Sequence, residues 1–130
     1  MAVLTRPTNR DVALPMVAAR AASAKKASDP VILDVGPVLA ICDYFVIASG
    51  SNDRQVRAIC DEIESEVRQA GGGSPIRVEG LADGRWVLLD YGDFVAHIFL
   101  DEAREYYDLE RLWADAARVP FEAPAAVVGE

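Results

Sequence analysis

Histidine and cysteine are scarce in this chain of 130 residues, which contains one histidine and two cysteines. A structural zinc site needs four closely spaced Cys or His ligands, and a small domain held by disulfides needs more cysteine than this. Cys42 and Cys60 do not form a Cys-x-x-Cys pair, and His97 stands alone. The sequence therefore predicts two buried thiols, no metal site and no cofactor.

Basic residues are outnumbered as well: 13 Lys and Arg stand against 21 Asp and Glu, a formal net charge of -8. A net negative field opposes binding to a phosphate backbone, so we expect no direct sequence-specific binding of nucleic acid. The chain has no run of about 20 apolar residues and no N-terminal pattern of an export signal. These absences favour a cytoplasmic protein that does not enter membranes.

Apolar residues make up 52% of the chain, enough for one domain with its own core. Apolar periodicity and turn signals predict a helix at 15–27, strands at 31–35 and 43–49, a helix at 52–70, strands at 75–80, 85–91 and 94–100, and two short helices within 101–113. This order predicts an α/β (α+β) domain, a mixed β-sheet of about five strands with helices packed on it. We expect the domain to span residues 1–113, followed by a flexible C-terminal tail at 114–130.

The helix predicted at 52–70 has the clearest pattern. Its apolar residues are spaced to share one face: Val56, Ile59, Cys60, Ile63, Val67 and Ala70. Asn52 and Gln55 resemble a capping box at its start, and glycines 71–73 follow its end. Asp101 and Asp108 are the expected N-caps of the two later helices.

The segment 84–99, GRWVLLDYGDFVAHIF, predicts a β-hairpin whose two faces differ. A two-residue turn at Gly92-Asp93, with Gly92 at positive φ, pairs Tyr91 with Phe94 and Trp86 with Phe99. Side chains alternate along a strand, so one face carries Val87, Leu89, Tyr91, Phe94, Ala96 and Ile98. We expect this apolar face to belong to the core.

The other hairpin face mixes aromatic and ionisable side chains: Trp86, Leu88, Asp90, Val95, His97 and Phe99. Aromatic anchors are enriched where proteins bind one another, so this face predicts a partner-binding surface. Asp90 and His97 lie diagonally within reach of a hydrogen bond that would orient the imidazole ring. The alternative is that a helix of the same chain covers this face, with Trp86 and Phe99 in the core and His97 a structural residue.

Three segments resemble the Iojap family, the ribosome silencing factors: DYFVIASGSNDRQVRAICDEIE, EGLADGRWVLLDYGDFVAHIF and REYYDLERLW. They follow one another with the family's spacing across residues 30–113. The resemblance implies a small mixed-sheet protein, a possible homodimer when free, that binds the large ribosomal subunit through its fourteenth protein. Bound there, such a protein blocks the small subunit sterically and represses translation when nutrients are limiting.

The resemblance also implies which residues bind the partner. The family's contact surface corresponds here to Arg85, Trp86, Leu88, Asp90 and Tyr91, with help from YYDLERLW, and the candidate set is completed by His97 and by Tyr107. An acidic chain suits a basic ribosomal protein. Tyr91, however, falls on the predicted core face, so either the end of the hairpin is open on both sides or the predicted register is wrong by one residue.

A nucleotidyltransferase-like enzyme, or a nucleotide-binding protein, is the strongest alternative. The strand, Gly50-Ser51 turn and helix of VIASGSNDRQ resemble the opening of that fold, in which backbone amides hold phosphates. Such enzymes also need two carboxylates at Asp-x-Asp spacing on one strand to hold metal ions. Asp90 and Asp93 are spaced Asp-x-x-Asp across a turn. We therefore expect the topology without a competent metal site, and no enzymatic activity.

Two further alternatives concern charged and exposed groups. Arg54 and Arg57 are expected to be solvated, or to pair with Asp61 and Glu64 on the helix, rather than to bind a phosphate. The hairpin face could also be a homodimer seam of a self-associating scaffold, because an exposed aromatic patch invites pairing.

Overall fold

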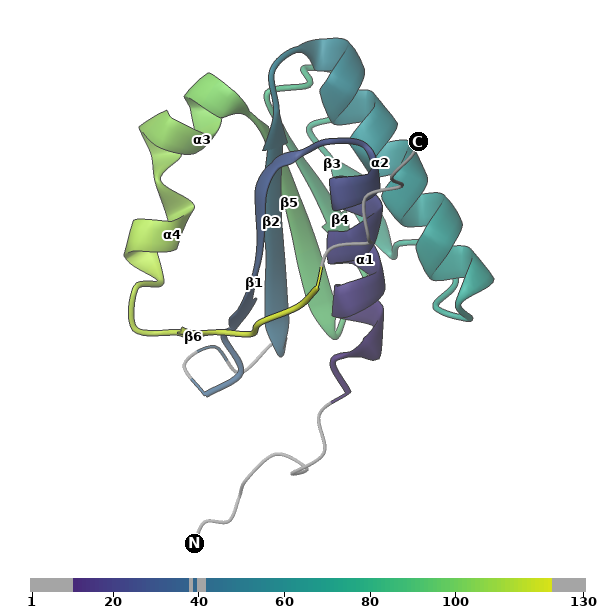
Figure 1. Ribbon diagram of the computed structural model, residues 1–130, viewed down its shortest axis with the longest axis vertical. Coiled ribbons are helices and arrows are strands. Elements are labelled where there is room, and N and C mark those ends of the chain that lie inside the picture. The colour runs from purple at the N-terminus through teal and green to yellow at the C-terminus, as the bar shows by residue number, and fades with distance from the viewer. Residues whose placement is uncertain (1–10, 38, 40–41, 123–130) are drawn as a thin grey trace, which may run out of the picture.

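A six-stranded sheet runs through the structure, a computed structural model that describes residues 11–37, 39 and 42–122 (Figure 1). The elements in chain order are α1 (Ala13–Ala24), β1 (Ser28–Asp34), β2 (Tyr44–Gly50), α2 (Asp53–Gln69), β3 (Arg77–Glu79), β4 (Trp86–Asp90), β5 (Phe94–Leu100), α3 (Asp101–Tyr107), α4 (Leu109–Leu112) and β6 (Ala117–Arg118). Helices α1 and α2 lie on one side of the sheet, and α3 and α4 lie on the other (Figure 1).

The sheet is mixed, as the sequence predicts. Its strand order is β3-β4-β5-β2-β1-β6. Strands β2 and β5 pair in parallel, while the other neighbouring strands pair antiparallel. The chain passes from β2 through α2, β3 and β4 before it reaches β5. Strand β5 of the β4–β5 hairpin then pairs with β2 in the centre of the sheet.

Helix α2 forms where its apolar spacing predicts. Its buried residues are Val56, Ile59, Cys60, Ile63 and Val67, whereas Ala70 is the exposed C-cap. The Asn52 side chain accepts a hydrogen bond from the Gln55 backbone N at 2.8 Å. The capping box is not completed, because Gln55 Oε1 accepts instead from the backbone N of Ser51, at 2.8 Å. Gly71 has a φ of 93°, in the left-handed region that lets glycine end a helix.

One of the two N-caps expected for the later helices is wrong. Leu100 occupies the N-cap of α3, so Asp101 is already its first helical residue. Asp108 does occupy the N-cap position of α4, with φ 50° and ψ 50°, but its side chain makes no cap hydrogen bond. An N-cap that bonds through its side chain normally has extended backbone, so the left-handed conformation of Asp108 explains the missing bond.

The predicted register of the β4–β5 hairpin is confirmed. Trp86 pairs with Phe99, Leu88 with His97 and Asp90 with Val95, and the Tyr91 N donates to the Phe94 carbonyl at 2.9 Å. Gly92 has a φ of 89°, as the tight turn requires.

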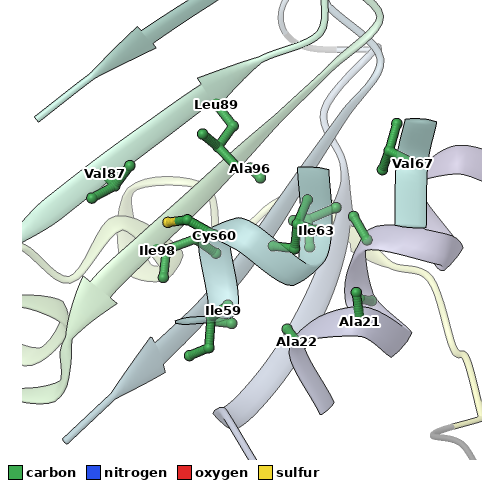
Figure 2. Close-up of a cluster of buried hydrophobic side chains, with 14 of the residues drawn as sticks. Ala21, Ala22, Ile59, Cys60, Ile63, Val67, Val87, Leu89, Ala96 and Ile98 are labelled. Carbon is green, nitrogen blue, oxygen red and sulfur yellow. The ribbon is translucent and has the colours of Figure 1, made fainter. Parts of the chain in front are cut away.

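The predicted core face packs against α2 and α1. Val87, Leu89, Ala96 and Ile98 are completely buried there. Figure 2 shows these strand side chains facing Cys60, Ile59 and Ile63 of α2, with Ala21 and Ala22 of α1 beyond them. Burial, together with nearby Glu64 and Asp61, raises the pKa of Cys60 to about 12, so this thiol remains protonated and unreactive at neutral pH. Cys42 is buried too, as expected.

The sheet continues past the predicted domain boundary at Trp113. Residues Ala117 and Arg118 form β6, which pairs with Asp34 and Leu33 of β1. The Val119 N then donates to the Ile32 carbonyl at 2.8 Å, and Val119 and Phe121 pack against the core on the α1 side. The expectation of a flexible tail from residue 114 is therefore wrong for 117–122, and residues 123–130 lie outside the described residues.

Arg104 anchors α3 and α4 to the sheet. Its side chain, 11% exposed, forms two hydrogen bonds of 3.0 Å to the carboxylate of Glu110. It also donates to the carbonyls of Ser28 and Asp29, both at 2.8 Å, and to Ser49 Oγ at 3.1 Å. The hydrogen bonds from Arg104 lower the pKa of Glu110. One side chain thus joins both helices to β1 and β2.

Replacing Arg104 with leucine should lower the free energy of unfolding by about 3 kcal/mol, because a largely buried carboxylate and two carbonyls lose their donor. Arg111→Leu is the matched control, since Arg111 is exposed on α4, and should change it by less than about 0.5 kcal/mol. Urea unfolding followed by circular dichroism measures both. Equally small effects would show that Arg104 does not anchor the helices.

Candidate functional site

Trp86 begins β4, on the sheet face opposite α1 and α2. It is partly buried, and its ring lies 4.9 Å from the ring of Phe99 and 4.9 Å from that of Tyr107. Its indole Nε1 donates a hydrogen bond of 3.1 Å to Nδ1 of His97. Strand β5 and helix α3 therefore hold the indole in one orientation while part of its surface remains accessible.

The helices cover only part of this face. Ala103 of α3 and Leu109 of α4 pack with Phe45, Ile47 and Phe99, so Phe99 is completely buried. On β4, by contrast, Trp86, Leu88 and Asp90 keep intermediate exposure. The alternative of a covered face is thus correct for Phe99, whereas the β4 side chains lie on an open surface.

His97 lies beneath this surface and is almost completely buried. It is 5% exposed, and burial lowers its pKa to about 4, so the imidazole is neutral at pH 7. Among the described residues, nothing forms a hydrogen bond with its buried Nε2. A partner can therefore contact His97 only through a group that inserts between the side chains around it.

The predicted hydrogen bond between Asp90 and His97 is not formed. The carboxylate of Asp90 accepts instead from the Gly92 N at 2.8 Å and from Arg77 Nη2 at 3.1 Å. Arg77 lies directly across from Asp90 in the β3–β4 pair, so the strand pairing supplies a closer and charged donor. Trp86, rather than Asp90, orients the imidazole of His97.

A cavity of about 400 Å³ opens beside His97 on the same face. Apolar side chains of four segments line it, among them Leu39, Phe45, Ile76, Leu88 and Val95. The charged side chains of Arg77, Glu79 and Asp90 also line it. Trp86 is joined to the cavity through His97, which accepts its hydrogen bond, and lies on the same face of β4 as Leu88 and Asp90.

The structure brings together most of the predicted site residues. Trp86, Leu88, Asp90 and Tyr107 share the open face, with His97 beneath them, and Arg85 lies at its end in a 3.3 Å ion pair with Glu102. Tyr91 is separated from them. It stacks on Phe94 on the core side, its hydroxyl is buried without a hydrogen-bond partner among the described residues, and burial raises its pKa to about 12.

Several residues of this face were not predicted from the sequence. Ile76, at 74% exposure, and Arg77 line the cavity from the β3 side. Tyr106 and Leu112, 78% and 75% exposed, belong by contrast to the YYDLERLW segment that the resemblance already included. The alternation Ile76-Arg77-Val78 did signal a strand, but only its pairing with β4 puts Arg77 next to Asp90.

The Gly50-Ser51 turn has its amides largely occupied. The Ser51 N donates to Gln55 Oε1 and the Gln55 N to Asn52 Oδ1, both at 2.8 Å. The interpretation as a tight strand-to-helix turn therefore fits better than a phosphate cradle. Arg57 is partly exposed and forms its 3.0 Å ion pair with Asp53 rather than with Asp61 or Glu64, and it also donates to the Ala82 carbonyl.

The described residues contain neither a metal-binding cluster nor a membrane-spanning helix. No group of three or more His, Cys, Asp or Glu side chains is placed to hold a metal ion in the part of the chain that the structure describes. Within that part, no helix has the length and apolar character needed to cross a membrane.

Comparison with known proteins gives a consistent result. The model of a family described as "Ribosomal silencing factor during starvation" matches residues 8–128. A ribosomal silencing factor of Bacillus subtilis is 42% identical over 100 residues, which are 77% of this chain and 84% of the relative. The chain belongs to the ribosomal silencing factor family. Membership implies ribosome-associated regulation of translation, and the resemblance seen in the sequence is confirmed.

Two more distant relatives of the present chain add detail. A crystal structure of a protein from Chromobacterium violaceum has a TM-score of 0.75 and 31% identity, covering 88% of this chain and 94% of that chain. A Mus musculus protein named "Mitochondrial assembly of ribosomal large subunit protein 1" is 33% identical over 91 residues, which are 68% of this chain and 40% of the mouse protein. The match to the Chromobacterium violaceum structure shows that the chain has the fold of a relative whose structure is known.

The sole histidine of this silencing factor should titrate near pH 4 rather than 6.5, because burial disfavours its charged form. Its folded-state pKa is below the unfolded value, so the unfolded chain binds the proton first as the pH falls. The contribution of His97 to the unfolding free energy is complete above pH 6.5 and declines by up to about 3 kcal/mol towards pH 4.

Proton NMR of the imidazole Cε1–H measures this titration without assignment, since the chain has one histidine. His97→Phe is the control for stability, because it should remove this part of the pH dependence while other groups continue to titrate. A midpoint near 6.5 in the folded protein would show that the imidazole is accessible to water.

Proposed function

We propose that this silencing factor represses translation by binding a protein of the large ribosomal subunit and sterically blocking the small subunit. The partner proposed is the fourteenth protein of the large subunit, and the condition is nutrient limitation. The description of the family supports a role in starvation, and the name of the mouse relative supports the large subunit. No chemical step is needed, because exclusion requires only that a folded domain occupy the contact area.

The observation that carries the proposal is the held, accessible Trp86 on the open face. Its hydrogen bond to His97 and its contacts with Phe99 and Tyr107 fix the indole before any partner arrives. Preorganised aromatic side chains lose little conformational entropy on binding and are common binding hot spots. Tyr107, 45% exposed beside Trp86, extends the same surface.

Charge supports the choice of a basic protein as partner. The chain has a net charge of -8, which favours approach to a basic protein surface and opposes contact with the RNA around it.

The proposed binding residues are those of the open face: Arg85, Trp86, Leu88, Asp90 and Tyr107, with His97 as the side chain that positions Trp86. Tyr91 is not included, since it packs on the opposite side of the sheet.

Homodimerisation of the free protein is proposed to use part of the same surface. Tyr106 is exposed and its ring contacts that of Tyr107, which contacts Trp86, and Leu112 is exposed on α4; apolar patches on a free protein favour self-association. Docking on the ribosome and dimerisation would then exclude each other.

Replacing Trp86 with alanine should weaken binding to purified large subunits by about 2 kcal/mol, or roughly thirtyfold, because a central aromatic anchor is removed. Tyr91→Ala is the matched control. It removes a partly buried aromatic side chain from the same hairpin, but from the opposite face, and should leave the affinity unchanged in protein that is still folded.

Sedimentation of each variant with large subunits measures the affinity, and thermal unfolding confirms that each is folded at the temperature used. Addition of small subunits then tests exclusion: the wild type should reduce joining and Trp86→Ala should not. Undiminished binding by folded Trp86→Ala, or equal loss with Tyr91→Ala, would contradict the proposed docking face.

A further inference from the structure

The cavity beside Trp86 has a buried polar group that steric exclusion alone does not explain. Most of its wall is apolar, from Leu39, Phe45, Leu88 and Val95. His97 also lines it, and the Nε2 atom of this ring is buried without a hydrogen-bond partner among the described residues. A buried polar atom left unpaired destabilises a protein, so such an atom in a binding surface indicates a ligand group that completes the pairing.

The hydrogen bond from Trp86 determines what Nε2 can do. An indole N–H can only donate, so Nδ1 of His97 must accept and therefore carries no proton. In the neutral imidazole the proton is then on Nε2. The cavity wall consequently contains a hydrogen-bond donor that has no acceptor among the described residues.

The charge of the cavity lining indicates which kind of partner residue can lie next to the side chain that occupies the cavity. Arg77, 62% exposed, is shared between Glu79 at 3.3 Å and Asp90 at 3.1 Å. Two carboxylates beside one guanidinium leave the lining with a net negative charge. A basic side chain next to the occupant would complement it, whereas an acidic one would be repelled.

We propose that this cavity receives one apolar side chain of the partner protein, whose main-chain carbonyl accepts a hydrogen bond from Nε2 of His97 and whose neighbour in the partner's chain is basic. The proposal rests on the proposed function, and it names the part of the partner that the surface selects. Leu88 and Asp90 line the cavity and lie on the same face of β4 as Trp86, so a partner that extends along this face from Trp86 reaches the cavity. His97 thus has two roles: it positions Trp86 through Nδ1 and binds the partner through Nε2.

Two substitutions of His97 separate these roles. Asparagine carries an oxygen the same number of bonds from the backbone as Nδ1, so His97→Asn keeps an acceptor for Trp86 and has no N–H at the position of Nε2. Glutamine carries an N–H at the distance of Nε2, so His97→Gln keeps a donor for the partner and removes the acceptor. His97→Asn should weaken binding to purified large subunits about tenfold, the value of one hydrogen bond of about 1.4 kcal/mol, and His97→Gln should weaken it less.

A second pair of variants tests occupation of the cavity without changing His97. Val95→Phe places a larger side chain on the cavity wall, and it should reduce binding at least as much as His97→Asn. Val78→Phe is the matched control, because Val78 is on β3 of the same sheet but pairs with Leu89 of the core face and does not line the cavity. It should bind like the wild type.

The outcomes distinguish this inference from the proposed function. Failure of the wild type to sediment with large subunits contradicts the proposed function itself. Wild-type affinity in folded His97→Asn, or normal affinity in Val95→Phe, overturns the cavity proposal while leaving docking intact. Loss of binding in His97→Gln with normal binding in His97→Asn also overturns it, since His97 would then act through Trp86 alone.

Two measurements on the free protein decide the remaining cases. Long-range proton–nitrogen NMR of the single histidine should find the proton on Nε2; a proton on Nδ1 would remove the proposed donor. Native mass spectrometry should find no small molecule that is retained by the wild type and lost in Val95→Phe. Such an adduct would assign the cavity to a small ligand and overturn the proposal of a partner side chain.

Discussion

The register of the β4–β5 hairpin decides on which face of the sheet every side chain of the site lies. Gly92 at φ 89° allows the tight turn, and the pairing of Trp86 with Phe99 follows from it. Because side chains alternate along a strand, a shift of one residue would move Trp86 into the core and expose Leu89. The turn thus separates an apolar face that stabilises the domain from a face that is available to a partner.

The available face is made rigid by a small number of polar interactions. The Trp86–His97 hydrogen bond holds the indole, and burial keeps the imidazole neutral, so that Nδ1 remains an acceptor across the physiological pH range. Arg104 holds α3 and α4 against β1 and β2 and thereby holds Tyr107 beside Trp86. A surface prepared in this way suits recognition by shape, as expected of a family that acts by silencing ribosomes.

Sequence patterns were sufficient where the signals were local. The apolar spacing of α2 and the Gly92-Asp93 turn predicted the helix and the hairpin pairing, because both depend on residues close in the chain. They failed where distant segments meet. The two-residue strand β6 exists only through its pairing with β1, and Arg77 reaches Asp90 only through the β3–β4 pair. The cavity, lined by four separate segments, left no pattern that the sequence could reveal.

The central claim, that the Trp86 face meets the large subunit, can be tested by oxidative footprinting of the full chain with and without large subunits. Met16 on α1 provides an internal reference, because it is partly exposed and lies with the helices on the opposite side of the sheet. The account predicts that bound subunits protect Trp86 and Tyr107 from oxidation and leave Met16 unchanged. Protection of Met16 with unchanged oxidation of Trp86 would place the contact on the helical face and contradict the account.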